Sequence, residues 1–506
     1  MRMNLKRILI AAMNRKRYRS FIHDTENPDL ARERLWQHEI LPLLKQSSYW
    51  SSKLQNNLNE FPITTYEDYE KELVTAQHSL IQPFNGEKLI FWSETSGTAG
   101  ARKFFPITAS FQKQFQRTMP PYIYSLTQRH PQLFKEKILY LVALDAHRHS
   151  PAGIPSGWIS HFNYRNLPPF IKRFYAMPDE LFDNMENYKQ WSALYALATD
   201  LSALFAVTPM VIHSLFEKCL KNFKIYLPFL LGEKNVPAHL PQLKITKKRQ
   251  AYLRQLAQSN PRFFKEFWPS LNVVGCWISG LCEFPAEQLQ KSLGSGIEMV
   301  DGTFSATEGW LTVPMDNKPG GFLHPGAHIV EFIEEGKSIK PENLLQSWEI
   351  EKGKKYEVFL TTAMGFVRYQ LKDVVACTGF LNKAPRLEFC YKTQMIILEG
   401  CSVSSQELQD MLQEISFEMA PYWYFARNGL GNRLVLVTDD ATQISESALI
   451  HMHQYLVQVN ENYALGAKNE EILPIVLLQL PLQELVADNH AQTKPKLISK
   501  QVITYK

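Results

Sequence analysis

Apolar stretches rich in β-branched and aromatic residues alternate with amphipathic stretches along most of the chain. The first kind of stretch predicts strands and the second predicts helices. Strands are expected at residues 89–92, 138–143, 271–279, 297–300, 356–362 and 366–369. Helices are expected at residues 29–44, 188–205 and 249–256. Because strands and helices follow one another in turn, the chain is predicted to be an α/β protein with several sheets.

The segment TGFLNKAPR (378–386) interrupts this pattern with a glycine, an asparagine and a proline. A compact unit follows it, in which Ser404 and Glu407 have the spacing of a capping box that opens a helix. Flanking strands and a second helix complete the pattern expected of a small α+β domain. We therefore expect a large body over residues 1–384 and a small, mobile C-terminal domain over 385–506, joined by a hinge near 378–386.

Composition narrows the class of protein. The chain has 506 residues, 45% of them apolar and 21% charged, which is typical of a soluble globular protein. A net charge of +5 is small for this length, so no nucleic-acid partner is expected. The six cysteines form no Cys-x-x-Cys pair, which favours reduced thiols and a cytoplasmic location. We expect a monomer.

The first residues are basic, and their apolar stretch at 8–13 is too short for a signal peptide. No other stretch approaches the roughly 20 apolar residues of a membrane span. A first helix that packs on the body is the simpler interpretation, and a helix that rests on a membrane surface is the alternative.

The most informative segment for function is SETSGTAGARKFF (93–105), which follows a predicted strand and combines hydroxyls, small residues and two cations. A loop with little side-chain bulk can direct several backbone N–H groups at one point, which suits phosphate oxygens. It is not a Walker A loop, because no Gly-Lys-Ser/Thr follows at the required spacing. On composition alone, a surface turn is the simpler interpretation.

A second segment, DGTFSATEGW (301–310), holds a lone carboxylate, Glu308, among small and hydroxyl residues such as Thr307. A carboxylate at a strand end could bind Mg²⁺ beside phosphate oxygens. Phe304 could offer its ring face to a base. Taken singly, Phe304 is more simply a core residue and Glu308 part of a solvated turn.

A third segment, GFVRYQLKDVV (365–375), places Arg368 and Asp373 in and just after a strand. The carboxylate could accept both hydrogen bonds from a ribose diol, and the arginine could neutralise a phosphate. By itself, this segment is more simply a surface ion pair near a hairpin.

In this order, the three segments resemble the motifs of the acyl-acid amido synthetases, a family typified by plant auxin- and jasmonate-conjugating enzymes within the superfamily that forms acyl-adenylates. The family's loop Ser-Ser-Gly-Thr-Ser-x-Gly-x-x-Lys is matched by residues 95–103, with one position contracted. The motif of an aromatic, small residues and a Glu is matched by 304–308, and Tyr-Arg-Tyr-x-x-Gly-Asp by 367–373. Residues 62–73 and 162–170 are also similar, so the resemblance covers nearly the whole chain.

The resemblance implies an adenylate-forming fold and a role for each matching residue. Lys103, Glu308 and Arg368 would be catalytic, and Glu308 would also bind Mg²⁺. The loop would hold the ATP phosphates, Phe304 would stack on adenine and Asp373 would hold the ribose. The residues implied to bind the nucleotide are Thr95, Ser96, Gly97, Thr98, Phe304, Thr307 and Asp373.

The chain departs from the family pattern at three positions. Lys372 occupies the place of a glycine, which costs about 1–2 kcal/mol if the turn needs a positive φ. Phe304 stands where the family often has tyrosine, and Ala99 replaces a usual serine. None of these changes removes a charge that the chemistry requires.

The expected function is an ATP- and Mg²⁺-dependent ligase that adenylates a carboxylic acid and passes the acyl group to an amino acid or similar amine. A thiol acceptor such as coenzyme A is one alternative, and a non-catalytic nucleotide-binding homologue is another. Trp277 and Phe304 are candidate walls of the acid pocket, with core burial about equally expected for Trp277. Lysines such as Lys392, Lys494 and Lys496 could close on the phosphates, although a solvated face is the simpler interpretation.

Overall fold

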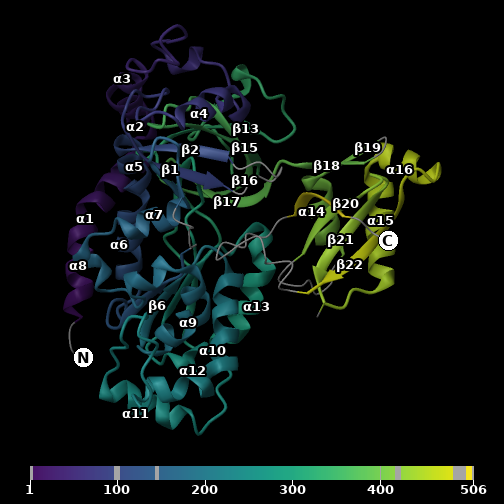
Figure 1. The fold of residues 1–506 in the computed structure, drawn as a ribbon. Coiled ribbons are helices and arrows are strands. Elements are labelled where there is room, and N and C mark those ends of the chain that lie inside the picture. The colour runs from purple at the N-terminus through teal and green to yellow at the C-terminus, as the bar shows by residue number, and fades with distance from the viewer. Residues whose placement is uncertain are drawn as a thin grey trace.

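The computed structural model describes residues 4–95, 103–142, 148–398, 401–415, 423–440, 442–481 and 497–503. Figure 1 shows a large body and, set to one side of it, a smaller C-terminal unit drawn from green to yellow. The described part of the body contains sheets of four, four and seven strands with helices around them. The prediction of an α/β protein with several sheets is therefore confirmed.

One four-stranded sheet of the body is parallel throughout, with the order β3-β6-β7-β8. Its strands are β3 (Lys137–Tyr140), β6 (Leu201–Phe205), β7 (Val273–Cys276) and β8 (Glu298–Asp301). The helices that run between these strands include α9 (Met185–Leu197), α10 (Pro209–Leu230), α11 (Lys247–Leu256), α12 (Phe264–Phe267) and α13 (Glu283–Leu293). Apolar side chains of the sheet and these helices form one buried cluster, which fixes the carboxyl ends of the strands.

A second four-stranded sheet has the order β2-β1-β5-β4. Its strands are β1 (Leu89–Thr95), β2 (Lys103–Thr108), β4 (Arg148–His149) and β5 (Pro155–Gly157). Helices α5 (Ala109–Phe115), α6 (Met119–Arg129), α7 (Ile159–Arg165) and α8 (Pro169–Lys172) lie near it in the chain.

The seven-stranded sheet is antiparallel, with the order β11-β12-β17-β16-β15-β13-β14. Its strands are β11 (Thr312–Val313), β12 (Gly321–Leu323), β13 (Ile329–Glu334), β14 (Leu345–Gln346), β15 (Lys355–Thr361), β16 (Tyr369–Leu381) and β17 (Ala384–Lys392). A short two-stranded ribbon of β9 (Ser305–Ala306) and β10 (Gly309–Trp310) precedes it.

The N-terminal helices are α1 (Leu5–Glu26), α2 (Pro28–Leu35), α3 (Leu41–Leu44) and α4 (Glu70–Ala76). Helix α1 packs along α6, where the ring of Tyr18 stacks on Tyr124 at 4.4 Å between centroids. This packing agrees with the simpler of the two interpretations of the first helix. Among the described residues, no helix combines the length and the apolar character needed to cross a membrane.

The C-terminal unit has its own apolar cluster. Its strands are β18 (Met395–Leu398), β19 (Cys401–Ser404), β20 (Trp423–Asn428), β21 (Arg433–Asp439), β22 (Leu473–Leu480) and β23 (Ile498–Ile503), and its helices are α14 (Ser405–Glu414), α15 (Glu446–Val459) and α16 (Glu461–Lys468). The expected capping box is present, because the Ser404 side chain accepts from the Glu407 N–H and the Glu407 carboxylate accepts from the Ser404 N–H.

Three expectations differ from the structure. The helix predicted over 188–205 ends at Leu197, and its last part is strand β6. The strand predicted at 366–369 is a loop up to Arg368, which has φ of +47°, and β16 begins only at Tyr369. The segment expected as a hinge, 378–386, forms the β16–β17 hairpin turn inside the seven-stranded sheet. Glycine, asparagine and proline suit a hairpin turn as well as a hinge, so composition alone did not separate the two.

Candidate active site

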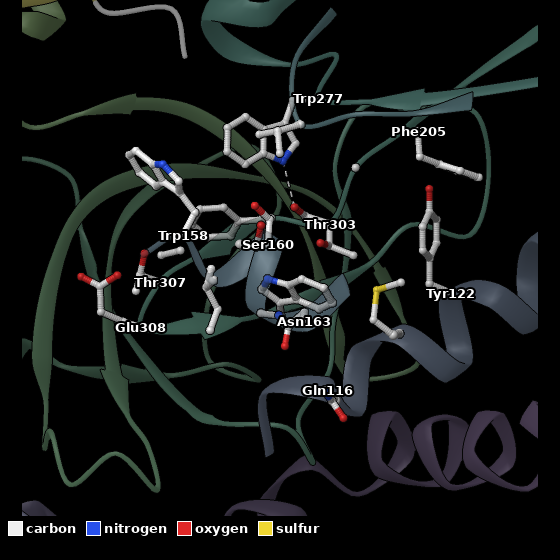
Figure 2. A pocket seen from close by; sticks show the side chains of 18 of the residues that line it. Gln116, Tyr122, Trp158, Ser160, Asn163, Phe205, Trp277, Thr303, Thr307 and Glu308 are labelled. Atoms are coloured by element: carbon white, nitrogen blue, oxygen red, sulfur yellow. Dashed lines mark hydrogen bonds between the residues drawn. The ribbon is translucent and has the colours of Figure 1, made fainter. Parts of the chain in front are cut away.

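A cavity of about 1710 Å³ lies where the three sheets of the body meet. Lys103 of β2, Phe205 of β6 and Asp373 of β16 line it, and Ile498 of the C-terminal unit adds to its wall. Side chains far apart in sequence therefore share one space. Figure 2 shows Glu308 at one end of this pocket, and Tyr122 and Phe205 at the other.

Five of the sequence-predicted site residues line this cavity. They are Lys103, Phe304, Thr307, Glu308 and Asp373. They come from three separate segments that the sheets bring together, as expected if the segments form one site. Thr95 is the last residue of β1 and pairs in register with Lys103, so it stands at the entrance to the loop. Ser96, Gly97 and Thr98 lie outside the described residues.

Lys103 is the first residue of β2, and its ammonium lies over the ring of Tyr66 at 4.4 Å from the centroid. Burial lowers the pKa of Lys103, although Glu67 and Glu308 oppose this effect. Tyr66 is itself fixed, because its hydroxyl oxygen accepts from the Phe104 N–H at 3.1 Å. The cation is thus held at the cavity wall with its charge available to an anion.

Glu308 lies in the turn between β9 and β10. Burial raises the pKa of Glu308, and the positive charge of Lys392 opposes that rise. The hydroxyl of Tyr369 is also close, and its pKa is raised by burial first and then by the charge of Glu308. A half-buried carboxylate that is costly to ionise alone gains from a cation beside it.

The adenine-stacking candidate, Phe304, is nearly buried, with 8% of its surface exposed. Its N–H donates to the Thr312 hydroxyl at 2.8 Å, and its ring lies 6.0 Å from that of Phe389. Trp277 also lines the cavity, and its indole N–H donates to the Thr303 carbonyl at 3.0 Å (Figure 2). Both rings are therefore walls of the cavity as well as parts of the core.

Asp373 forms an ion pair with Lys392 across the β16–β17 ladder. The Lys392 ammonium also donates to the Leu371 carbonyl at 3.2 Å. Burial alone would lower the pKa of Lys392, but Asp373 and Glu308 raise it above its ordinary value. Lys392 therefore belongs to the body's side of the site, as the last residue of β17.

The sequence contains a signal for the Asp373–Lys392 pair that the prediction missed. Asp373 and Lys392 lie equally far from the turn at 382–383, so a hairpin centred there places them opposite each other. Because residues 378–386 were interpreted as a hinge, this pairing was not predicted.

Arg368 does not line the cavity, contrary to its expected role. Its guanidinium is buried and forms two hydrogen bonds with the Glu331 carboxylate, at 3.1 and 3.0 Å. It also donates to the carbonyls of Asn59 and Phe61 at 3.2 and 3.0 Å. Since every one of these bonds ties parts of the body together, Arg368 is a structural residue in this arrangement.

Sequence reasoning missed Asn163, which α7 places in the cavity (Figure 2). Both polar atoms of its side chain are buried and have no hydrogen-bond partner among the described residues. Burying an unpaired amide costs about 1–3 kcal/mol. A bound polar group of a substrate would relieve that cost.

The carboxylates of the site decide how it could bind Mg²⁺. This ion is commonly bound by one or two carboxylates, with substrate phosphates and water completing its shell. Glu308 provides such a carboxylate, and no group of three metal-ligating side chains was found in the part of the chain that is described. The residues therefore fit a cation that arrives with a triphosphate, rather than one held by protein ligands alone.

The geometry can be compared with known proteins. Residues 17–298 match the profile of the GH3 family N-terminal domain, and residues 321–392 match the GH3 family central domain. Among curated relatives, the chain is 21% identical over 438 residues to indole-3-acetic acid-amido synthetase GH3.2 of Arabidopsis thaliana, covering 78% of this chain and 79% of that protein. It is 29% identical over 168 residues to jasmonoyl--L-amino acid synthetase GH3.5 of Oryza sativa subsp. japonica, covering 29% of each.

The alignments to the first relatives cover different shares of those proteins. The putative indole-3-acetic acid-amido synthetase GH3.10 of Oryza sativa subsp. japonica is 26% identical over 155 residues, which is 29% of this chain and 32% of that protein. In structure, the chain is similar to a GH3.15 acyl acid amido synthetase, with a TM-score of 0.78 and 16% identity over 96% of this chain and 94% of that one. This likeness shows that the two share a fold.

Proposed function

This chain belongs to the GH3 family, and from that premise we propose that it is an ATP-dependent acyl-acid amido synthetase. It would adenylate a carboxylic acid and transfer the acyl group to an amino acid or similar amine. The observation that carries the proposal is the convergence of Lys103, Glu308 and Asp373 on one cavity wall, from three distant segments.

The first half-reaction is attack of the substrate carboxylate on the α-phosphorus of ATP, with pyrophosphate as leaving group. It needs alignment of the reactants and neutralisation of phosphate charge more than a strong base. We assign the phosphates to Lys103 and to the loop residues Thr95, Ser96, Gly97 and Thr98, with Thr307 beside them. Arg368 is not part of this assignment, because its charge is neutralised by Glu331.

Mg²⁺ bound at Glu308 would supply positive charge to the phosphate oxygens. Phe304 would offer its ring to adenine, and Asp373, fixed by Lys392, would accept from the ribose hydroxyls. The side chain of Asn163 has a donor and an acceptor that find no partner in the described part of the chain, so we assign it to orienting the carboxylate of the acid or the incoming amine.

The second half-reaction is attack of the amine on the adenylate carbonyl, which expels AMP. A single cavity could serve both steps if the C-terminal unit moves between them. We place the boundary between the two units after Lys392, because β17 ends there and β18 begins at Met395. A cytoplasmic location and a monomeric state remain predictions from the sequence.

Exchange of labelled pyrophosphate into ATP, driven by a panel of carboxylic acids, tests the proposal. We expect acid-dependent exchange in the wild type and a loss of at least a hundredfold in Glu308→Ala and in Asp373→Ala, with unfolding midpoints close to wild type. Trapping with hydroxylamine, amino acids or coenzyme A then identifies the acceptor. Binding of ATP without exchange for any acid would instead support the non-catalytic homologue.

A further inference from the structure

Part of the cavity wall is built from a group of hydrocarbon side chains, which we call the apolar arm; Asn14 and Arg17 of α1 line the same cavity. Its walls come from α6, the following loop, β3 and the segment around α8. They are the side chains of Leu126, Leu133, Phe134, Ile138, Ile171 and Phe174. Five of them are buried members of one apolar cluster of the body and Ile171 packs against it, so these side chains are part of the core.

Tyr122 and Phe205 lie at the end of the pocket away from Glu308 (Figure 2), and Tyr122 is on α6 together with Leu126 of the arm. The Tyr122 hydroxyl donates to the Asp301 carbonyl at 3.1 Å, which holds that ring to one side. A Cβ at Gly275 would lie 2.4 Å from a ring carbon of Phe205. Glycine at position 275 therefore lets the Phe205 ring lie against the sheet, whereas a larger residue would displace the ring.

The wall of the arm contains a strained residue. Phe134 has φ of +64°, and its ring packs edge-on against Phe174 with 5.6 Å between centroids. A bulky side chain in this conformation is rare and costs about 1–2 kcal/mol. Strain of this kind is retained where the surrounding structure imposes it, often at a binding site. Here it sets the shape of the Phe134–Phe174 wall.

The whole cavity measures about 1710 Å³ and must hold ATP and the amine as well as the acid. The six side chains of the apolar arm carry no charge and offer no hydrogen bond to a second polar group. The arm suits a chain of methylene groups, whose transfer from water is favourable.

We propose that the arm binds the tail of the acid, and that the preferred substrates are aliphatic carboxylic acids of medium or long chain. The inference rests on the proposed function. The carboxylate lies at the charged end beside Asn163, and the hydrocarbon tail passes Tyr122 into the arm.

Pyrophosphate exchange with straight-chain acids from two to sixteen carbons, and with benzoic acid, tests the proposal. Each methylene that enters the arm should raise kcat/KM about three- to fourfold, the factor that corresponds to about 0.8 kcal/mol, until the arm is full. Phe174→Leu should shift the optimum to longer acids, because it removes part of the wall. Leu126→Phe should shift it to shorter ones.

Phe21→Leu is the matched control, since Phe21 belongs to the same apolar cluster but does not line the cavity. It should lower the unfolding midpoint without changing the chain-length optimum. Best activity with benzoic or short acids, with no response to Phe174→Leu, would overturn the arm while leaving the adenylating function intact.

Calorimetric titration of the protein with decanoic acid decides the case in which no acid supports exchange. Binding that Leu126→Phe weakens, and that acetic and benzoic acids do not compete with, supports the arm even though the ligase proposal has failed. No binding overturns it.

Discussion

Arg368 and Lys372 lie four positions apart, and both have left-handed backbone conformations, with φ of +47° and +60°. Their surroundings differ completely, because Arg368 is 3% exposed and paired with Glu331, whereas Lys372 is exposed. The left-handed conformation at Lys372 explains why the family pattern has glycine there. It also shows that this chain keeps the turn without the glycine.

Replacing Arg368 with glutamine should lower the free energy of unfolding by about 3–5 kcal/mol, because it leaves the Glu331 carboxylate buried without its main partner. The lower end is expected, since Arg32 lies 3.6 Å from that carboxylate and Gln346 donates to it. Urea unfolding measures the change. Adding Glu331→Gln should recover part of it. If the Arg368 variant kept its stability but lost pyrophosphate exchange, Arg368 would be a residue of the active site and not a structural one.

Lys372→Gly should raise the free energy of unfolding by about 0.5–1 kcal/mol. Relief of the left-handed conformation raises the free energy of unfolding by about 1–2 kcal/mol. The greater conformational freedom of glycine in the unfolded chain lowers it by about 0.5–1 kcal/mol. Lys372→Ala keeps the Cβ and is the control, for which no gain is expected. Equal stabilisation in both variants would show that the lysine side chain, and not the backbone, is the unfavourable feature.

Among the elements, the β16–β17 hairpin does most to build the charged site. The pairing of β16 with β15 is irregular between Glu357 and Phe359, where β16 carries extra residues that include Lys372. Such bulges redirect side chains at the edge of a site. Here the bulge includes Asp373, which lines the cavity and pairs with Lys392.

The end of this hairpin is also where the chain passes to the C-terminal unit. The Thr393 N–H donates to the Lys372 carbonyl of the body at 2.8 Å, while the Gln394 N–H donates to the Ser405 hydroxyl of α14 at 3.0 Å. We infer that the pivot of any domain motion lies between Thr393 and Gln394, since the acceptors of the backbone N–H groups change there from the body to α14.

Gln394→Pro should separate the two half-reactions, because proline fixes φ and removes the N–H that bonds to Ser405. We expect pyrophosphate exchange to stay within severalfold of wild type and amide formation to fall at least tenfold. Asn382→Gly, in the hairpin turn, is the control and should change neither rate. If the Asn382 variant alone slowed amide formation, the hinge would lie at 378–386 after all.

At the scale of the whole molecule, the body buries ionisable groups away from the cavity as well as within it. His324 and His328 are buried, and burial lowers the pKa of each imidazole to about 3, with Arg117 nearby adding to the effect. The His324 ring packs against Phe21 of α1, so it joins the first helix to the seven-stranded sheet. Both imidazoles are therefore neutral in the folded protein near neutral pH.

These imidazoles should make the body sensitive to acid. Below about pH 6.5 the unfolded chain takes up protons that the folded protein does not, so stability falls as pH falls from about 6.5 toward 3. Each imidazole contributes about 1.4 kcal/mol per pH unit in that window. His324→Asn keeps an acceptor for the Gly326 N–H, which bonds to the His324 Nδ1 at 3.1 Å, and it should reduce the slope by that amount.

Urea unfolding at pH values from 4 to 7 measures this slope. His239→Asn replaces an exposed imidazole and should leave the slope as in wild type. An unchanged slope in the His324 variant would show that this imidazole titrates freely in the folded protein.

The sequence by itself determined the class of fold, the capped helix at Ser404 and the three segments whose residues line the cavity. These features depend on local periodicity, on caps and on residue order, all of which are set by residues close together in the sequence. Only the tertiary structure decided that Arg368 turns away to Glu331, that Lys392 meets Asp373, and that the expected hinge is a hairpin turn. Such outcomes depend on which surfaces pack together, and Glu331 lies 37 residues from Arg368 in the chain. The apolar arm was beyond prediction for the same reason, since its walls become a cavity only when α6, β3 and the segment around α8 are assembled.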